Sequence, residues 1–373
     1  MSHEIAGGRT TGALGALEAR RARTWTIVAA VAVAALRLYE CGLLPTETGD
    51  IVRNVLYGVA VDSHGVSAAS RPLTELSSAW SSVAWARFPY NYPPLALAFF
   101  ALIAAISPTL FAAKLALTVI EAANAWLIGK LTGSRVLGLI YWASPLSIWW
   151  VSREGQFEPL QAFFMLLAIR AAMSAPFVCG LMGALAVSVK VTAGALVPWL
   201  SGRIWHLGRR ARIAALLGLA LGSIPLIAAQ LFYGGVSNVL RYSALLRYNP
   251  YYWNPWADMF TGNAPVFVFV DETASFGLLA VLIALGIRSR DWLAYFAPIA
   301  FVVFCKVHGN VEFWYWLLLP AFLVPIPNAR WRFALIALCP MLDIHSAVEL
   351  VSGTIGPIRF HGLPSVFDLY TMP

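Results

Sequence analysis

Hydrophobic residues occur along this chain in long runs, and short charged or turn-forming segments separate them. The runs cover residues 25–44, 109–130, 136–151, 157–174, 176–200, 212–233, 273–287, 292–305, 312–327 and 331–351. Roughly 20 apolar residues let a helix cross the hydrocarbon core of a bilayer. A shorter run, 93–107, begins with two prolines and predicts an interfacial or re-entrant helix. The pattern predicts an all-α, polytopic transmembrane bundle of about 10–12 membrane helices, some of them broken or re-entrant.

Composition favours the same class. Hydrophobic residues make up 60% of the chain and charged residues 12%, against about 25% charged in soluble proteins. Residues 1–23 are polar and Arg-rich, without a cleavage pattern after the first run, so we expect a cytoplasmic tail followed by a retained anchor. Residues 24–351 then form one transmembrane catalytic domain and 352–373 a C-terminal tail. The net charge of +8 is spread over short loops, which argues against nucleic-acid binding.

Positive charges in short loops predict the orientation of the chain, because such loops face the cytoplasm. The clusters are Arg20/Arg21/Arg23, Lys130/Arg135, Arg203/Arg209/Arg210/Arg212, Arg288/Arg290 and Arg330/Arg332. All five share one side if the run 176–200 breaks at Lys190 and turns back. The opposite, non-cytoplasmic face then receives the outer loops 45–108 and 234–271 together with the unusual polar residues. We therefore expect a multi-pass cell-membrane protein with its site on that face.

Ionisable residues beside the apolar runs are the first candidates for chemistry, since charges at membrane depth are costly and mark functional sites. Lys190 interrupts a run and suits a phosphate group as a point charge, or it snorkels to the interface. His308 follows Lys306 and could donate to a phosphate oxygen, or it is an interfacial histidine without chemistry. A short turn between two runs carries Arg153, Glu154, Gln156 and Glu158, either as part of a site or as loop polarity at the water interface.

The two outer loops supply further candidates. Asp50 lies just past the first run and is a possible general base, or a loop aspartate that caps a helix. Tyr92 precedes two prolines at a helix start. Tyr252 and Trp253 suit stacking on sugar faces or anchoring at lipid headgroups. The four isolated cysteines predict packing roles. No metal-ligand spacing and no phosphate-binding glycine loop occur, so no cofactor is required, although a divalent cation on the carboxylates is possible without being indicated.

Several short motifs follow one another in a familiar order. They are Gly49-Asp50, Tyr92-Pro93-Pro94-Leu95, Ser152 to Glu158, Ala186 to Lys190, and Lys306 to Pro320. In this order the chain resembles the polyprenyl-phosphate-sugar-dependent glycosyltransferases of the C superfamily. It is similar in particular to PIG-M-type GPI mannosyltransferases and to actinobacterial polyprenol-phosphate-mannose-dependent mannosyltransferases. It departs from the PIG-M pattern at Val52, where that pattern has a second acidic residue.

The resemblance implies an inverting transfer of a sugar, most simply mannose, from a polyprenyl-phosphate donor to a lipid-linked or glycan acceptor. By that likeness Asp50 is the general base. The implied donor-phosphate contacts are Lys190, His308, Arg153 and Lys306, and the implied lining residues are Glu154, Gln156, Glu158, Tyr92, Tyr252 and Trp253. Two alternatives stay open: a lipid or glycolipid transporter without catalysis, and an enzyme that uses a lipid-diphosphate donor. The absence of an internal repeat in the sequence favours an enzyme over a transporter.

Overall fold

The computed structural model describes residues 7–46, 50–172, 174–239 and 313–342, with isolated positions at 281, 294, 297, 298, 301 and 350. These residues form fourteen α-helices and no β-strand, which confirms the predicted all-α class. Three helical stretches are long and apolar enough to cross a membrane: Thr24–Cys41, Leu110–Thr132 and Arg209–Tyr233. These three stretches indicate a membrane protein. The predicted runs 273–287 and 292–305 lie almost entirely outside the described residues.

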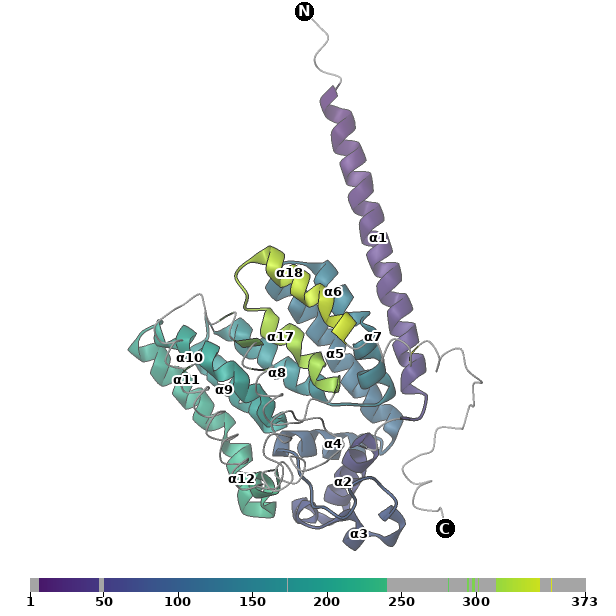
Figure 1. Ribbon diagram of the computed structural model, residues 1–373, viewed down its shortest axis with the longest axis vertical. Coiled ribbons are helices and arrows are strands. Elements are labelled where there is room, and N and C mark those ends of the chain that lie inside the picture. The colour runs from purple at the N-terminus through teal and green to yellow at the C-terminus, as the bar shows by residue number, and fades with distance from the viewer. Residues whose placement is uncertain are drawn as a thin grey trace, which may run out of the picture.

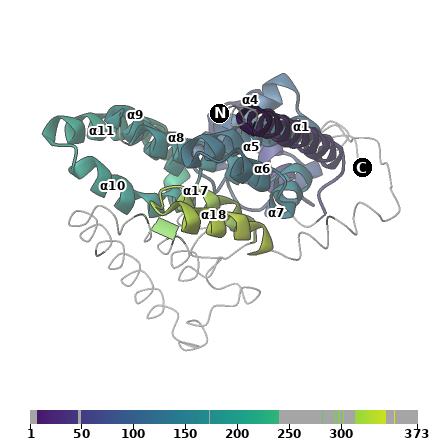
Figure 2. The ribbon, with the colours of Figure 1, turned by 90° about the horizontal axis from the view of Figure 1, so that it is seen from above.

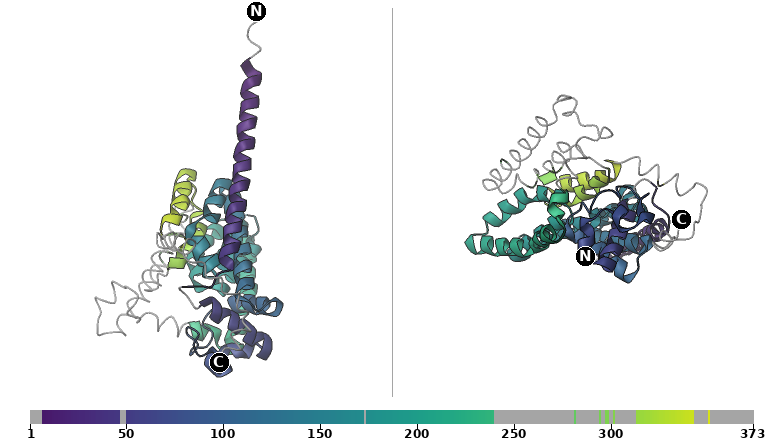
Figure 3. Two further views of the ribbon diagram at one scale, coloured as in Figure 1. Left: turned by 90° about the vertical axis from the view of Figure 1, so that its right-hand side faces the viewer. Right: turned by 90° about the horizontal axis from the view of Figure 1, so that it is seen from below.

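The long helices form the frame of the molecule. Helix α1 (Gly7–Cys41) extends well beyond the other helices, as two views show (Figures 1 and 3). Helix α5 (Leu110–Thr132) lies beside it. Seen from above, α8, α9 and α11 form one row, with α10, α17 and α18 alongside (Figure 2). The bounds of these are α8 Glu158–Ala171, α9 Pro176–Val189, α10 Val197–Trp205, α11 Arg209–Gly222, α17 Leu319–Leu323 and α18 Ala329–Leu338.

The segment after α1 folds into short helices at one end of the molecule, at the bottom of Figure 1. They are α2 (Asp50–His64), α3 (Leu73–Leu76) and α4 (Pro94–Ile106). A Cβ atom on Gly58 would lie 2.4 Å from the carbonyl oxygen of Phe100, so α2 and α4 touch through their backbones. Burial raises the pKa of Tyr57 to about 12, and its protonated hydroxyl donates to the carbonyls of Arg71 and Phe88. The predicted loop 45–108 is thus a packed helical layer.

Two apolar runs are broken in a way that matters for the site. The predicted break at Lys190 is confirmed: α9 ends at Val189, and a 3-10 helix, Val191–Leu196, leads into α10. The run 136–151 was expected as one span and is divided instead. Helix α6 (Arg135–Trp142) ends before Pro145, which starts α7 (Pro145–Ser147), and a π-helical turn covers Ile148–Arg153. Proline cannot donate to the preceding helical turn, which explains the interruption.

Glycines bring α9 and α11 into close contact. A Cβ on Gly180 would lie 2.0 Å from the carbonyl oxygen of Ala215, and one on Gly218 would lie 1.9 Å from that of Phe177. Small residues at membrane helix interfaces allow such backbone contact, which strengthens packing where no hydrophobic driving force exists. Past Ser223 the chain continues from α11 into α12 (Ile224–Tyr233). The α9–α11 pair therefore tolerates no side chain at these positions.

We expect Gly180→Ala to destabilise the protein by about 1–3 kcal/mol, because the added methyl group must push two helices apart. Gly183→Ala is the matched control, since Gly183 lies one turn away on the same helix and its Cβ would meet only a leucine methyl group at 3.5 Å. Alanine in that helix interior should be neutral or stabilising. Thermal unfolding of the two variants in detergent measures the difference, and equal unfolding temperatures would contradict the close contact.

Candidate functional site

The helix break at position 190 places a lysine in the interior of the protein. Lys190 has an extended backbone (φ −156°, ψ 137°) and ends α9, and its side chain is buried. Its ammonium nitrogen lies 2.5 Å from Oε1 of Glu158, the first residue of α8. The Gln161 side chain donates to the Lys190 carbonyl at 2.6 Å and holds the break in place. A buried ion pair thus joins the ends of two neighbouring helices.

Aromatic rings surround the remaining sides of the Lys190 ammonium group. Its nitrogen lies 4.2 Å from the ring centroid of Tyr315, 5.3 Å from that of Phe157 and 5.7 Å from that of Tyr92. Ring faces attract cations at such distances, so the three rings add to the attraction of Glu158 for this cation. Tyr315 has the nearest ring and received no role from the sequence. It lies in an aromatic stretch, and the sequence pattern does not say which ring of that stretch meets the cation.

Asp50 lies at the edge of this group. The Tyr92 hydroxyl is 3.4 Å from Oδ2 of Asp50, which is a long and weak hydrogen bond. The same Tyr92 ring packs edge-on against Phe157, with centroids 4.8 Å apart. Asp50 is partly exposed at the first turn of α2, whereas Glu158 is fully buried. The group therefore contains one accessible carboxylate and one buried ion pair, with aromatic rings between them.

A glycine allows the segments that carry Asp50 and Glu158 to meet. Gly155 has φ +74°, a conformation that L side chains rarely adopt. A Cβ there would lie 2.7 Å from Cγ1 of Ile51, the neighbour of Asp50. The preceding π-helical turn is a feature often found at functional sites. The turn and the glycine together fold the segment 153–158 against the start of α2.

Arg153 and Glu154 belong to a second polar group, built against α1 and α5. Arg153 pairs with Glu40 at 3.2 Å. Glu154 accepts hydrogen bonds from the Thr46 backbone nitrogen at 2.7 Å and from the Thr46 hydroxyl at 2.9 Å. Arg153 was expected to contact the donor phosphate, but the structure brings it to α1 rather than to Lys190. Lys114 on α5 donates to the Leu43 carbonyl at 2.6 Å and completes this group.

Glu154, Gln156 and Glu158 are all buried, which excludes the interpretation that they are polar residues of a solvated loop. The Gln156 backbone nitrogen donates to the Trp150 carbonyl at 2.8 Å, which fixes the turn. Burial of a charge without a partner is costly, and both glutamates have partners. The structure therefore gives this turn a fixed polar interior.

Sequence reasoning overlooked a buried network around Arg37. The Arg37 guanidinium donates to the Trp142 carbonyl, the Ser147 carbonyl and hydroxyl, and the Ser152 hydroxyl. Ser147 in turn donates to Glu121, which also accepts from the Tyr141 hydroxyl at 2.7 Å. The sequence contains a signal for this network, namely four ionisable residues inside apolar runs: Arg37, Glu40, Lys114 and Glu121. The network anchors the interrupted segment 142–153 to α1.

Lys306, His308, Tyr252 and Trp253 lie outside the described residues. Within the part of the chain that the structure describes, no group of three or more histidine, cysteine, aspartate or glutamate residues is arranged to hold a metal ion. Cys41, Cys179 and Cys339 are buried and unpaired with one another. Of the predicted site residues, the structure brings Asp50, Tyr92, Glu158 and Lys190 together.

Comparison of the chain with protein-family models, with curated proteins and with solved structures found no match. Only the geometry of the site and the order of its motifs therefore bear on its chemistry. The geometry supplies a partly exposed carboxylate near the hydroxyl of Tyr92 and a buried cation near the ring of the same tyrosine. That arrangement suits a reaction in which one end of the substrate loses a proton and the other end gains negative charge.

Proposed function

We propose that this protein is an integral membrane glycosyltransferase that moves a sugar, most simply mannose, from a polyprenyl-phosphate donor to a lipid-linked or glycan acceptor. One observation supports the proposal most. Asp50 and Lys190 come from separate motifs of the resemblance, and both contact Tyr92, with Asp50 Oδ2 3.4 Å from its hydroxyl and Lys190 Nζ 5.7 Å from its ring centroid. A general base and a phosphate-binding cation are the two groups that such a transfer requires.

The reaction follows from these groups. Asp50 takes the proton of an acceptor hydroxyl while that oxygen attacks the anomeric carbon of the sugar. The bond from the anomeric carbon to the phosphate oxygen breaks, and polyprenyl phosphate leaves with the electron pair. Attack opposite the leaving group inverts the anomeric configuration. The sugar is already activated by its phosphate, so the transfer needs neither a nucleotide nor a cofactor.

Lys190 would meet the departing phosphate while it stays paired with Glu158. An ammonium group has three donors, so one bond to Glu158 leaves others for phosphate oxygens. Glu158 Oε2 has no hydrogen-bond partner among the described residues. A buried oxygen of this kind calls for a donor, and a sugar hydroxyl of the substrate would supply one. The ion pair would thus hold both the phosphate and the sugar of the donor.

The proposal includes a multi-pass chain of about 10–12 membrane helices in the cell membrane, with the site on the non-cytoplasmic face. Two observations support this orientation. Arg332 donates to the Thr132 carbonyl at 3.3 Å, so two basic clusters lie at the same end of the helices. Helix α1 (Gly7–Cys41) runs from that end, at the top of Figure 1, toward the layer that contains α2, whose first residue is Asp50. Basic loops face the cytoplasm.

The orientation predicts opposite labelling of two exposed positions. Single cysteines at Asp62 and Arg209, in a protein whose four native cysteines are replaced, should react with an impermeant maleimide from opposite sides of oriented vesicles. We expect Asp62→Cys to react from the outer side and Arg209→Cys from the cytoplasmic side. Reaction of both positions from the same side would rule out the proposed placement of the site.

The direct test supplies purified protein in lipid nanodiscs with polyprenyl-phosphate mannose, polyprenyl-phosphate glucose or polyprenyl-phosphate galactose. A membrane lipid extract serves as the source of acceptors. We expect time-dependent release of free polyprenyl phosphate from one donor and a new glycosylated product of matching amount. A protein denatured before assembly is the control. Absence of release from every donor with every extract would refute the enzyme.

A transporter of lipid-linked sugars is the second candidate, because the interrupted α9–α10 helix resembles the broken helices that bind substrate in transporters. The same protein in liposomes distinguishes the two. A transporter moves labelled polyprenyl-phosphate mannose between leaflets and leaves its sugar–phosphate bond intact. The glycosyltransferase breaks that bond.

A further inference from the structure

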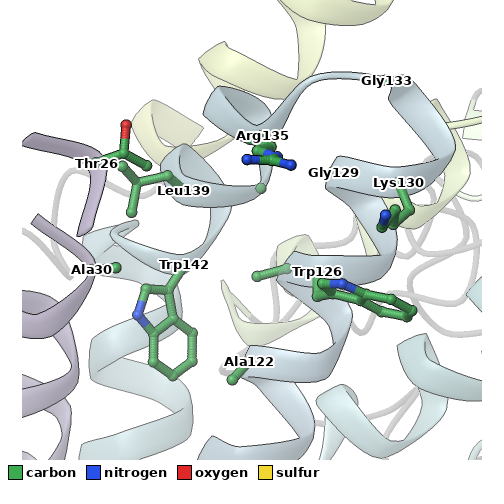
Figure 4. A pocket seen from close by; sticks show the side chains of 12 residues that line it. Thr26, Ala30, Ala122, Trp126, Gly129, Lys130, Gly133, Arg135, Leu139 and Trp142 are labelled. Carbon is green, nitrogen blue, oxygen red and sulfur yellow. The ribbon is translucent and has the colours of Figure 1, made fainter. Parts of the chain in front are cut away.

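A groove far from Asp50 opens between α1, α5 and α6 (Figure 4). Its volume is about 590 Å³. It lies at the end of α5 that carries Lys130, whereas the polar group around Glu154 contacts Lys114. These two lysines are 16 residues apart on one helix, which corresponds to about 24 Å along its axis. The groove is therefore a separate feature from the proposed catalytic site.

The rim of the groove is basic. Lys130 and Arg135 both line it and are both exposed, and Figure 4 shows them on either side of the turn at Gly133. Gly133 has φ +72° and ends α5, and the Ser134 hydroxyl caps α6 by accepting from the Leu137 nitrogen. This short turn fixes the two cations on one rim. None of the 12 lining residues is acidic, so among the residues that the structure describes in this groove an anion meets two positive charges and no negative one.

The rest of the groove is apolar and shaped by small residues. Ala30, Ala122, Ala125 and Gly129 line it, together with the side chains of Trp126, Leu139 and Trp142. Trp142 is held rigidly, because the Arg37 guanidinium lies 4.1 Å from its ring centroid. Only 17% of the membrane-spanning part of α1 is buried inside the protein, so most of that span is open to lipid beside the groove. An apolar groove at that depth accommodates an acyl chain rather than water.

We propose that this groove binds an anionic glycerophospholipid from the leaflet at the Lys130–Arg135 end, with its phosphate between the two cations and one acyl chain along the apolar wall. Basic pockets between membrane helices recognise anionic lipid headgroups in this way. The Trp126 ring lies 5.9 Å from the Lys130 ammonium group and provides the interfacial contact expected at headgroup level. This lipid binding requires only that the helices lie in a membrane, and it does not depend on the proposed glycosyl transfer.

The test measures binding of fluorescent phosphatidylglycerol to the full chain in detergent, with fluorescent phosphatidylcholine as the zwitterionic comparison. We expect Lys130→Gln/Arg135→Gln to weaken phosphatidylglycerol binding about 10- to 30-fold, the effect of two basic residues near a lipid phosphate. Arg209→Gln/Arg210→Gln is the matched control, since it removes the same charge from two exposed arginines outside the groove. That control should bind as the unaltered protein does.

A second variant tests the acyl-chain part without any change of charge. Ala122 lines the groove and is exposed, so Ala122→Phe should fold and fill the path, and should weaken phosphatidylglycerol binding by at least about fivefold. Equal losses in the two arginine-containing double variants would overturn the site in favour of a diffuse basic surface. Equal affinity for phosphatidylcholine and phosphatidylglycerol, or full binding by Ala122→Phe, would overturn it as well.

Discussion

Replacement of Asp50 by asparagine is expected to lower turnover at least about 100-fold, because general-base catalysis is typically worth 10²–10⁴. Asparagine keeps the size of the side chain and can still accept from the Tyr92 hydroxyl, but it cannot take the acceptor proton. Binding of the donor should be unchanged, since in the proposed site Lys190 and Glu158, and not Asp50, hold its phosphate and sugar. The measurement is single-turnover release of polyprenyl phosphate, paired with donor binding at equilibrium.

Two neighbouring carboxylates provide the controls. Asp62 is exposed at the far end of α2, and Glu75 is exposed and pairs with Arg71 at 3.6 Å. Asp62→Asn and Glu75→Gln should keep turnover within about twofold of the unaltered protein, because exposed residues of this kind have small effects. Near-normal turnover in Asp50→Asn combined with loss in either control would transfer the role of base to that control residue.

Removal of the Lys190 charge should cost about 3–5 kcal/mol of stability, because it leaves Glu158 buried without its partner. Lys190→Met keeps the volume of the stem and removes only the cation. The double variant Lys190→Met/Glu158→Gln removes both charges and should regain most of that stability. It should nevertheless fail to use the donor, since no cation then faces the phosphate. Unfolding temperatures of the unaltered protein, Lys190→Met and the double variant measure the effect on stability. Donor turnover of the same three proteins measures the effect on catalysis.

The pair Arg71 and Glu75 is the matched comparison for this experiment. Its two side chains are more than half exposed, and an exposed ion pair contributes at most about 1 kcal/mol. Arg71→Met should therefore hardly change the unfolding temperature. If Lys190→Met is equally harmless, the Lys190–Glu158 contact is not a buried ion pair. If the neutral double variant turns over the donor normally, Lys190 has no part in the chemistry.

Sequence patterns predicted the positions of unusual residues well and their partners poorly. The break at Lys190 and the meeting of Asp50, Tyr92, Glu158 and Lys190 follow from charges that interrupt apolar runs and from the order of the motifs. Arg153 shows the limit of such reasoning. The resemblance implies a phosphate contact for this residue, and the structure pairs it with Glu40, 113 residues earlier, a partner that no sequence pattern indicates. Hydropathy reveals that a charge requires a partner, and only packing of the helices decides which one it meets.

The division of the run 136–151 had a local signal in Pro145, whose ring interrupts a helix. The π-helical turn that follows had none, because it depends on the anchoring of Ser147 and Ser152 by Arg37 from another helix. Tyr315 was equally hidden among neighbouring aromatic residues. In each case the decisive contact joins segments that are far apart in sequence. The spacing of hydrophobic residues and the composition describe only one segment at a time, so neither reveals such a contact.

The Arg37 network has a consequence for biogenesis. Its acceptors lie 105 to 115 residues further along the chain, so α1 is synthesised and reaches the translocon before they exist. At about 5–20 residues per second the guanidinium waits on the order of 5–20 s. A lone arginine at the centre of a membrane helix raises the insertion free energy by about 2.5–3.5 kcal/mol, and Arg37, four residues before the end of the span Thr24–Cys41, carries part of that cost. Helix α1 should therefore stay beside the translocon, or be held by an insertase, until the Ser147–Ser152 segment arrives and releases it into the bilayer.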